Sequence, residues 1–419
     1  GDFTHPAWRM ELREKLEPAE EGLYVLKKPY RLLDEGESPR FVVTGEISSI
    51  YKRDGKTRKV HNLLLLPSLE KGEELSERLS QVGNLNAVGR PILKLDSEDL
   101  LGMLLDTSPE GELIPAHIWT PHFSMFGAFS AFSTLEECFG DLAGHIHGIE
   151  TGLSSDRPMH AGVPALAGTR LLSTSDAHSP GKLGREASLL EIDLSYQNLL
   201  DAIRQGEESG WRGTIEFFPQ EGKYHWDGHR ACGVSMAPEE GEKRGNICPV
   251  CGKKLTIGVE HRVEELADRP AGFCPKGAKP FESLAPLPEV IAASTGLSAG
   301  GKKVAQQYEQ MLEQLGPEFS ILREVPPEEI ERVAGPCVAE GIRRLRTGRV
   351  QRRAGFDGEY GMISLLTPAE IEQFSGQTSL FGFEAPPRQQ APTQAGGAAE
   401  KAAPNRKTEP KRGESLNEQ

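Results

Sequence analysis

The sequence predicts an α/β fold with mainly parallel strands, followed by a small metal-binding module and a helical region. Between residues 40 and 218, short apolar runs alternate with helix-like segments, as they do in successive strand and helix units. Residues 221–280 are rich in Gly, Pro, Cys and charge with little periodicity, and helical patterns return from residue 288. At about 150 residues per domain, a chain of 419 residues has room for two or three domains.

The first region contains seven candidate strands and four candidate helices. The strands are expected at residues 41–43, 60–66, 113–119, 146–149, 170–173, 189–194 and 214–218. The helices are expected between them at residues 68–79, 97–105, 133–139 and 195–203. Each helical pattern opens at a serine, whose hydroxyl can accept from the free amides of the first turn.

Beyond the small module, helices are expected at four further places. They are residues 288–296, 300–315, 327–346 and 367–374. Thr367 and Glu370 form a capping box with Pro368 at the first helical position, which is a strong helix start. Residues 384–419 hold five prolines, no aromatic residue and one large aliphatic residue, and we expect a disordered tail there.

Composition and charge exclude some classes of function. The chain carries 48 Lys and Arg against 62 Asp and Glu, a formal net charge of −14, which argues against a uniformly basic coat for nucleic acid. A local DNA-binding face remains compatible with this balance. No apolar run approaches the ~20 residues of a membrane span. Six cysteines are too few for a disulfide scaffold, so we expect a cytoplasmic protein with a metal site.

Polar side chains of metal-binding types follow several of the expected strands. They are Glu46, His61, His117, Glu150, Asp176 and His178, with Asp2 and His5 near the start of the chain. The strand ends of a parallel barrel converge on one face, and imidazoles with carboxylates suit metals that activate water and hold a phosphate. Each residue alone is equally consistent with a strand cap or a surface position. Glu150 also suits a role in orienting a ligand or contacting the substrate.

The motifs around these residues resemble those of the PHP (polymerase and histidinol phosphatase) superfamily, and more closely those of endonuclease Q. The similar strings run in order from residue 1 to about residue 366: GDFTHPAW, TGEISSIY, HNLLLLPS, PAHIWTPHFSMFG, IETGLSSD, SDAHSPGKLGREAS, EGKYHWDGHRAC, CPVCGKKLTIGV, RVEELADRP and FDGEYG. The resemblance implies a PHP-type distorted (β/α) barrel over residues 1–220. It also implies a metal-dependent DNA repair endonuclease that cuts 5′ of a deaminated base (uracil, hypoxanthine or xanthine) or an abasic site.

The resemblance also implies a set of site residues. Two or three divalent metals (Zn, Mn or Mg) would be held by Asp2, His5, Glu46, His61, His117, Glu150, Asp176 and His178. The catalytic members of this set would be Glu46, His117, Asp176 and His178. PHP domains begin with a strand that carries a His-x-His pair of ligands, and none precedes Asp2 in this sequence. We therefore expect the first strand of the barrel to be missing from this sequence. The chain would then lack the two histidine ligands on which the activity of a PHP domain depends.

Residues 221–280 contain two ligand pairs with the spacing of a zinc knuckle. His229 and Cys232 are separated by two residues, as are Cys248 and Cys251 in a Cys-Pro-Val-Cys-Gly string. Such pairs let tight turns aim four side chains at one tetrahedral ion, and a structural zinc would replace the core that this segment lacks. Two alternatives stay open: only Cys248 and Cys251 pair, as a redox motif, or Cys274 takes the place of His229.

Two further features are candidates for contact with DNA. Residues 341–353 carry six arginines and no acid, among them Arg343, Arg344 and Arg346, and we expect residues 281–366 to form a helical DNA-binding region. A solvated helix end paired with Glu340 explains the arginines equally well. The aromatic loop at residues 122–129 suits a pocket for an extruded base, with core packing as the alternative.

Residues 367–383 comprise the last helix and a short motif. Gln377, Leu380 and Phe381 stand in a pentapeptide that resembles the bacterial sliding-clamp-binding peptide. In such a peptide the apolar Leu and Phe side chains insert into a pocket of the clamp, and the Gln side chain forms hydrogen bonds with it. We therefore expect a sliding clamp as a partner.

Taken together, these features predict an endonuclease acting on double- or single-stranded DNA with deaminated bases. A small-molecule phosphatase of the PHP type is the alternative within enzymes, since it needs the same metals without the zinc module or the arginines. A clamp-tethered DNA-binding protein with an incomplete metal site is the alternative outside enzymes.

Overall fold

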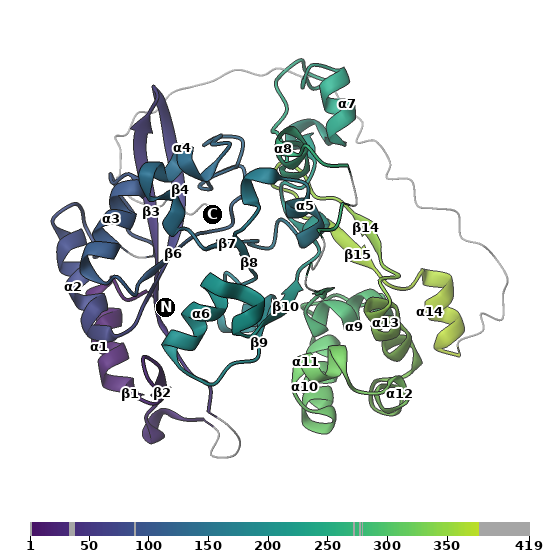
Figure 1. The fold of residues 1–419 in the computed structure, drawn as a ribbon. Coiled ribbons are helices and arrows are strands. Elements are labelled where there is room, and N and C mark those ends of the chain that lie inside the picture. The colour runs from purple at the N-terminus through teal and green to yellow at the C-terminus, as the bar shows by residue number, and fades with distance from the viewer. Residues whose placement is uncertain are drawn as a thin grey trace, which may run out of the picture. The chain divides into compact units, whose positions relative to one another are not determined.

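Figure 1 shows the fold in a computed structural model of the chain. The structure describes residues 2–32, 38–87, 89–270, 273–275, 278 and 280–376. The expected clamp-binding residues Gln377, Leu380 and Phe381 lie outside the described residues, as does the expected tail at residues 384–419. No helix of the described residues is long and apolar enough to cross a membrane.

The first sheet is built around a long antiparallel hairpin of β3 (Val43–Arg53) and β4 (Lys56–Leu66). Asp54 and Gly55 at its turn have φ angles of 53° and 74°, the conformation that an Asp-Gly hairpin turn adopts readily. β5 (Ile92–Leu93) pairs with β3 in parallel, and β6 (Glu112–Pro115) pairs with β4 in antiparallel fashion, so the order is β5-β3-β4-β6.

The other strands of the first region form smaller sheets. β7 (Gly148–Glu150) pairs in parallel with β8 (Arg170–Leu172). β10 (Trp211–Glu216) lies between β9 (Ala187–Leu190), which is antiparallel to it, and β13 (Phe281–Ser283), which is parallel. β1 (Leu16–Pro18) and β2 (Tyr24–Leu26) form an antiparallel pair.

The α/β class is confirmed, but the expectation of mainly parallel strands is wrong. Six of the nine strand pairs among the described residues are antiparallel. The recorded pairs divide into six sheets, and within the described residues they do not close into a barrel. One cause is the two-residue turn after β3, because a connection that short joins only antiparallel strands.

The helices of the first region are α1 (Pro6–Lys15), α2 (Leu69–Ser80), α3 (Ser97–Thr107), α4 (Leu135–Phe139), α5 (Arg157–Ala161) and α6 (Tyr196–Gln205). All four helices expected in this region are therefore present. Ser68 and Ser195 cap α2 and α6 as expected, whereas Asp96 and Thr134 supply the caps of α3 and α4. Figure 1 shows α1, α2 and α3 along one side of the sheet of β3 and β4, and Leu75 and Leu100 share a buried core with Ile47.

The segment with the ligand pairs contains β11 (Asp227–His229), β12 (Val234–Met236), α7 (Pro238–Lys243) and α8 (Val259–Leu266). Its own core is small, with Met236, Cys248 and Leu255 as the buried members. Val259 and Val263 of α8 instead pack into the core of the first region. The segment therefore has little core of its own.

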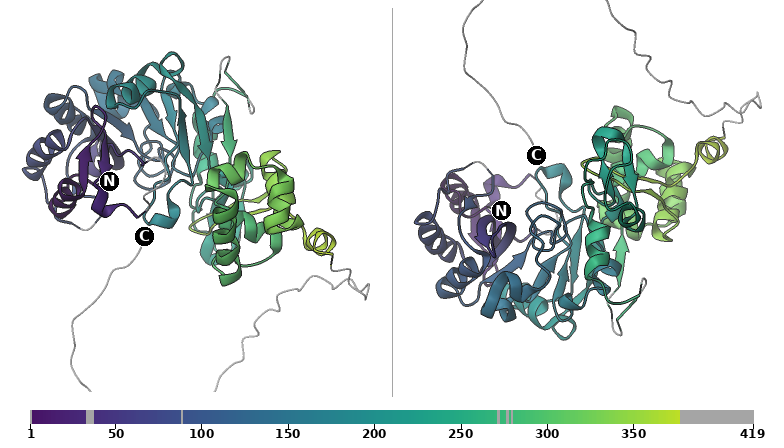
Figure 2. Two further views of the ribbon diagram at one scale, coloured as in Figure 1. Left: turned by 90° about the horizontal axis from the view of Figure 1, so that it is seen from below. Right: turned by 90° about the horizontal axis from the view of Figure 1, so that it is seen from above.

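The C-terminal elements are α9 (Leu287–Thr295), α10 (Lys302–Leu315), α11 (Glu318–Arg323), α12 (Pro327–Ala334), α13 (Pro336–Arg346), β14 (Gln351–Arg353), β15 (Met362–Ser364) and α14 (Pro368–Phe374). Both views of Figure 2 show α9 to α13 as one cluster, with α14 at its edge. The expected helix at residues 327–346 is two helices, because Gly335 has a φ of 83° and Pro336 opens a new helix. The capping box of α14 is confirmed.

Short 3₁₀ helices complete the described structure. They are Lys28–Tyr30, Gly140–His145, Pro164–Leu166, Pro180–Lys182, Gly206–Ser209, Pro219–Glu221 and Arg230–Cys232.

Candidate metal centre

Glu46 and His61 lie in the middle of the β3-β4 hairpin, not at strand ends as the sequence suggested. The register pairs Glu46 with Leu63 and Ser48 with His61. Glu46 and His61 are therefore diagonal neighbours on one face of the sheet, within reach of each other. His117 joins them from the segment just after β6, whose Ala116 amide donates to the His61 carbonyl.

The three side chains bring their ligand atoms together. Glu46 Oε1 lies 3.0 Å from His61 Nδ1 and 3.5 Å from His117 Nε2. The two ring nitrogens are 3.1 Å apart, and the ligand atoms all lie within 4.8 Å of one another. Glu46 Oε1 is buried and accepts no hydrogen bond of good geometry, which is the condition of a ligand atom that suits a cation.

The backbone and its neighbours hold His117 in place. Its φ of 30° is unusual for a residue with a Cβ, and such strain persists only where the surroundings enforce it. The amide of His117 donates to Glu150 Oε2 at 2.7 Å, and Nδ1 lies 3.1 Å from Thr120 Oγ1. A Cβ on Gly152 would come within 2.1 Å of His117 Cβ, so only glycine leaves room for this arrangement.

Electrostatics keep the cluster in a state suited to a cation. Burial opposes ionisation of Glu46, but His117 and His61, together with Arg90, hold the pKa of its carboxyl well below the ordinary value. Burial lowers the pKa of His61 despite the attraction of Glu46. Burial also acts to lower the pKa of His117, but Glu46 and Glu150 outweigh it and raise the value. The cluster thus contains an ionised carboxylate.

Arg90 links this cluster to two further site residues, and sequence reasoning missed it. Its Nε lies 2.5 Å from Glu46 Oε2. Its Nη2 lies 3.3 Å from Asp176 Oδ1 and 3.2 Å from His178 Nε2. Arginine is not a metal ligand and Arg90 stands in a loop, so no pattern of residue types pointed to it. Asp176 has a φ of 41°, a second strained backbone at the same site.

The remaining predicted ligands have other partners. Asp2 Oδ1 accepts from the Thr4 amide at 3.0 Å and from the Thr4 hydroxyl. His5 Nδ1 accepts from the Ala7 amide at 3.2 Å and caps α1. The group of close ligand atoms at this place has three members among the described residues, Glu46, His61 and His117. It does not include Asp2, His5, Glu150, Asp176 or His178.

Glu150 holds the backbone of His117, a candidate ligand, in place. Both of its carboxylate oxygens are engaged, one by the His117 amide and the other by the Thr174 hydroxyl. Burial raises the pKa of its carboxyl. The sequence left ligation, orientation of a ligand and contact with the substrate open for Glu150, and the geometry favours orientation of His117.

A second group of ligand atoms forms from the two predicted pairs. His229, Cys232, Cys248 and Cys251 bring one ligand atom each within 4.8 Å of the others, and His229 Nδ1 lies 3.6 Å from Cys251 Sγ. One nitrogen and three sulfurs at this separation suit tetrahedral zinc. Cys274 is exposed and is not a member of the group. The structure therefore assembles the set with His229.

Arg343, Arg344 and Arg346, which were expected to bind DNA, form hydrogen bonds to groups of the protein itself. Arg343 and Arg344 each bond to Glu340 at 2.7 Å, and Arg344 also bonds to Glu370 at 2.7 Å. Arg346 donates to three backbone carbonyls at 2.7 to 2.8 Å. These contacts match the alternative of a paired helix end.

The aromatic loop after His117 is divided between the core and the surface. Met125 and Phe126 are fully buried, as the core-packing alternative expects. Phe129 is 57% exposed, and its ring stacks on His122 at 4.2 Å with an interplanar angle of 12°. The loop therefore presents one open aromatic surface, in the segment that follows His117.

Comparisons with known proteins agree with this fold. The family model described as the MJ0043 C-terminal domain matches residues 286–349. The uncharacterized protein MJ0043 of Methanocaldococcus jannaschii is 31% identical over 270 residues, which are 62% of this chain and 33% of that protein. The chain thus spans about one third of the length of this relative. The uncharacterized protein YqxK of Bacillus subtilis is 29% identical over 354 residues, with 82% of this chain and 84% of that protein covered.

Two solved structures are similar over most of the chain. One is the crystal structure of the lesion-specific endonuclease PfuEndoQ from Pyrococcus furiosus, with a TM-score of 0.75, 28% identity and 89% of each chain covered. The other is endonuclease Q in complex with a 27-mer duplex substrate that has an abasic lesion at the active site, with a TM-score of 0.75, 28% identity and 88% of each chain covered.

Fold and motifs together make this chain similar to endonuclease Q over most of its length. The resemblance to the endonuclease Q family that the ordered sequence motifs indicate is thereby confirmed.

Proposed function

We propose that this chain is a metal-dependent DNA repair endonuclease. The observation that carries the proposal is the convergence of Glu46, His61 and His117 within a fold that matches a lesion-specific endonuclease over 89% of the chain. The similarity to endonuclease Q in complex with a DNA duplex supports DNA, not a small phosphate ester, as the substrate.

Different residues of the site would bind the metal ions and the phosphodiester. Glu46, His61 and His117 would hold a divalent ion through a carboxylate oxygen, Nδ1 and Nε2, respectively. Such an ion, when bound, polarises a phosphoryl oxygen and lowers the pKa of water. Arg90 stands between this group and Asp176, where its planar fork suits the non-bridging oxygens of a phosphodiester. We assign Asp176 and His178 to a second ion, as the family resemblance implies.

We assign cleavage to the phosphodiester 5′ of a deaminated base or an abasic site. An enzyme that reads a base in a duplex must take that base out of the stack. The stacked pair of His122 and Phe129 supports this assignment, since Phe129 has an open face and bases stack on exposed aromatic rings.

We assign binding of the DNA backbone to the exposed strand β14. Its residues Gln351 to Arg353 are all exposed, and Arg352 lies over the Phe218 ring at 4.9 Å. Guanidinium groups on an exposed strand can meet phosphates, whereas that of Arg346 donates to three backbone carbonyls. The assignment of Gln377, Leu380 and Phe381 to a sliding clamp rests on their motif alone.

Nicking of labelled duplexes with a single deoxyuridine, deoxyinosine or abasic site tests the function. With Mn²⁺ or Zn²⁺ supplied, the chain should nick these duplexes and leave an undamaged duplex intact. Glu46→Gln and Asp176→Asn should each lower the nicking rate ~100-fold, in line with the loss of a metal ligand or its support. In a gel-shift assay the affinity of both variants for the duplex should stay within about threefold of that of the parent chain. Glu73→Gln, at an exposed residue of α2 paired with Arg13, is the matched control.

Two outcomes would overturn the proposal. Undiminished nicking by both variants would remove the metal centre from the reaction. Hydrolysis of histidinol phosphate without cutting of any duplex would instead establish a small-molecule phosphatase.

A further inference from the structure

The aromatic loop contains a segment, residues 126–132, that holds one ring in the open between two buried ends. Phe126 and Phe132 at its ends are fully buried, whereas Phe129 at its centre is exposed. Ala131 has a φ of 53°, a conformation that residues with a Cβ seldom adopt. Such a conformation persists where the surroundings enforce it, so the shape of the segment depends on what binds its backbone.

Two buried arginines bind that backbone. Arg262 of α8 is 9% exposed, and its Nε and Nη2 donate to the carbonyls of Phe126 and Phe132, both at 2.9 Å. Arg58 of β4 is 5% exposed. Its guanidinium donates to the Ser130 carbonyl and lies 4.1 Å from the centroid of the Phe132 ring. Three carbonyls of one short segment are thus bound by two guanidinium groups.

The burial of these two charges is costly and only partly offset by acids. Arg262 Nη1 donates to Glu265 Oε2 at 2.7 Å. Asp54, which faces Arg58, is 3.8 Å away and its side chain is exposed. Apolar side chains of similar volume often fill such space at a lower cost in stability. The two arginines therefore indicate that the shape of residues 126–132 serves more than packing.

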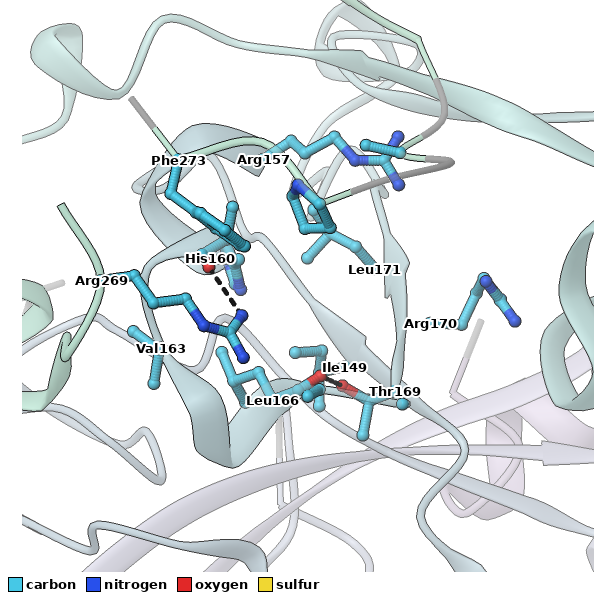
Figure 3. Close-up of a pocket in the computed structure, with 15 residues that line it drawn as sticks. Ile149, Arg157, His160, Val163, Leu166, Thr169, Arg170, Leu171, Arg269 and Phe273 are labelled. Atoms are coloured by element: carbon cyan, nitrogen blue, oxygen red, sulfur yellow. Dashed lines mark hydrogen bonds between the residues drawn. The ribbon is translucent and has the colours of Figure 1, made fainter. Parts of the chain in front are cut away.

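Helix α8 gives Arg262 a fixed support. At its start, the amide of Gly258 donates to Asp227 Oδ1 at 2.7 Å. Just after the helix, Arg269 Nη1 donates to the carbonyl of Ala161 in α5 at 3.1 Å (Figure 3). Because α8 is held at both ends, the guanidinium of Arg262 can hold the loop in one place.

We propose that Arg262 is a positioning residue that pre-organises the open face of Phe129 to stack on a base taken out of a damaged duplex. Arg262 does not contact the base and acts through the backbone of residues 126–132. A ring that is already in place loses little freedom when the base binds, so more of the stacking energy appears as affinity. This inference rests on the proposed function, since it concerns the base that the nuclease would extrude.

Fluorescence anisotropy of the full chain without divalent metal tests the proposal, with labelled duplexes that differ only in one deoxyuridine. The parent chain should bind the deoxyuridine duplex at least about tenfold more tightly than the undamaged duplex, in line with one stacked base. Arg262→Lys keeps the charge but lacks the planar fork that spans both carbonyls, and it should lose this preference. Its affinity for the undamaged duplex should stay within about threefold, because that affinity comes from phosphate contacts.

Two further variants separate positioning from a general loss of stability. Glu265→Gln removes the ion pair but leaves both bonds from Arg262 to the loop, and it should bind both duplexes as the parent chain does. Phe129→Ala, at an exposed ring with little demand on folding, should lose the preference as Arg262→Lys does. Hydrogen exchange of the amides in residues 126–132 should accelerate in Arg262→Lys and stay unchanged in Phe129→Ala and Glu265→Gln.

The outcomes distinguish this proposal from the proposed function. If the parent chain nicks the deoxyuridine duplex and either Arg262→Lys or Phe129→Ala keeps its preference, the positioning role is refuted and the nuclease stands. A parent chain that nicks this duplex but binds both duplexes equally would refute the role as well, as would loss of preference in Glu265→Gln. A parent chain that nicks no damaged duplex refutes the proposed function and this role with it.

Discussion

At the scale of single residues, the candidate metal centre combines ligands with residues that only position them. Glu46, His61 and His117 are metal-binding types and were predictable as such. Arg90 and Gly152 were not, because a guanidinium is no metal ligand and the role of Gly152 rests on one tertiary contact with His117. Residue type therefore identifies candidates for ligation, whereas the support around them depends on the fold.

Arg90 competes with metal for Glu46, and this competition can be measured. Removal of the ion pair in Arg90→Gln frees the carboxylate and should tighten Mn²⁺ or Zn²⁺ binding about tenfold, the equivalent of one charged hydrogen bond, while nicking falls because no guanidinium meets the phosphate. Arg90→Lys should restore part of the nicking. Calorimetry gives the metal affinity. If Arg90 had a purely structural role, Arg90→Gln would instead weaken metal binding and nicking together, which would contradict this expectation.

Gly152 tests how closely the backbone controls His117. Gly152→Ala places a Cβ 2.1 Å from His117 Cβ at a φ of 64°, so we expect a loss of ~1–3 kcal/mol in stability and at least tenfold weaker metal binding. Gly168→Ala is the matched control, since its φ is 98° and its Cβ would meet nothing within 4 Å. Gly168→Ala should lose stability but keep its metal affinity. Thermal melts measure the stability of both variants and metal titrations measure their metal affinity. If Gly152→Ala and Gly168→Ala bound metal equally well, Gly152 would have no role in placing His117.

At the scale of elements, local signals were predictive and long-range pairing was not. Helices with strong caps, such as α2 and α14, lie where they were expected because a cap is a local hydrogen bond. Strand β3 is longer than expected because the polar residues after Gly45 show no apolar run, and only pairing with β4 makes them a strand. That same pairing brings Glu46 beside His61, which explains why these residue types could be singled out from the sequence and their geometry could not.

We expect the segment between β11 and α8 to depend on the four candidate ligands His229, Cys232, Cys248 and Cys251. Its own core is small, so zinc binding should supply most of its folding free energy. Treatment with a strong chelator, or Cys248→Ser, should expose residues 229–255 to limited proteolysis and lower the melting temperature. Cys274→Ser is the matched control because Cys274 is exposed and outside the ligand group. Equal protease sensitivity of Cys248→Ser and Cys274→Ser would show that no metal holds this segment.

At the scale of the whole molecule, several buried ionisable groups tie stability to pH. Burial raises the pKa of Glu186 and Glu221 to about 8 and that of Glu216 to about 7. Burial also lowers the pKa of His160 to about 3 and that of His225 to about 4. The folded chain thus retains carboxyl protons that the unfolded chain releases near pH 4.5, and it keeps these two histidines neutral.

The signs of these shifts predict a stability maximum in mildly acidic solution. Between about pH 4.5 and pH 6.5 the unfolded chain holds two more protons at His160 and His225, and the folded chain holds three more at Glu186, Glu216 and Glu221, so the two effects largely offset each other. Above about pH 6.5 the histidines have no further effect, while the folded chain still holds carboxyl protons that the unfolded chain has released, so stability falls more steeply until these groups ionise near pH 7 to 8. Melting temperatures measured from pH 5 to pH 9 should therefore decline above about pH 6.5. Glu186→Gln, which mimics the protonated carboxyl, should flatten the alkaline limb, and a melting temperature that climbs steadily to pH 9 would refute the assignment of these protons.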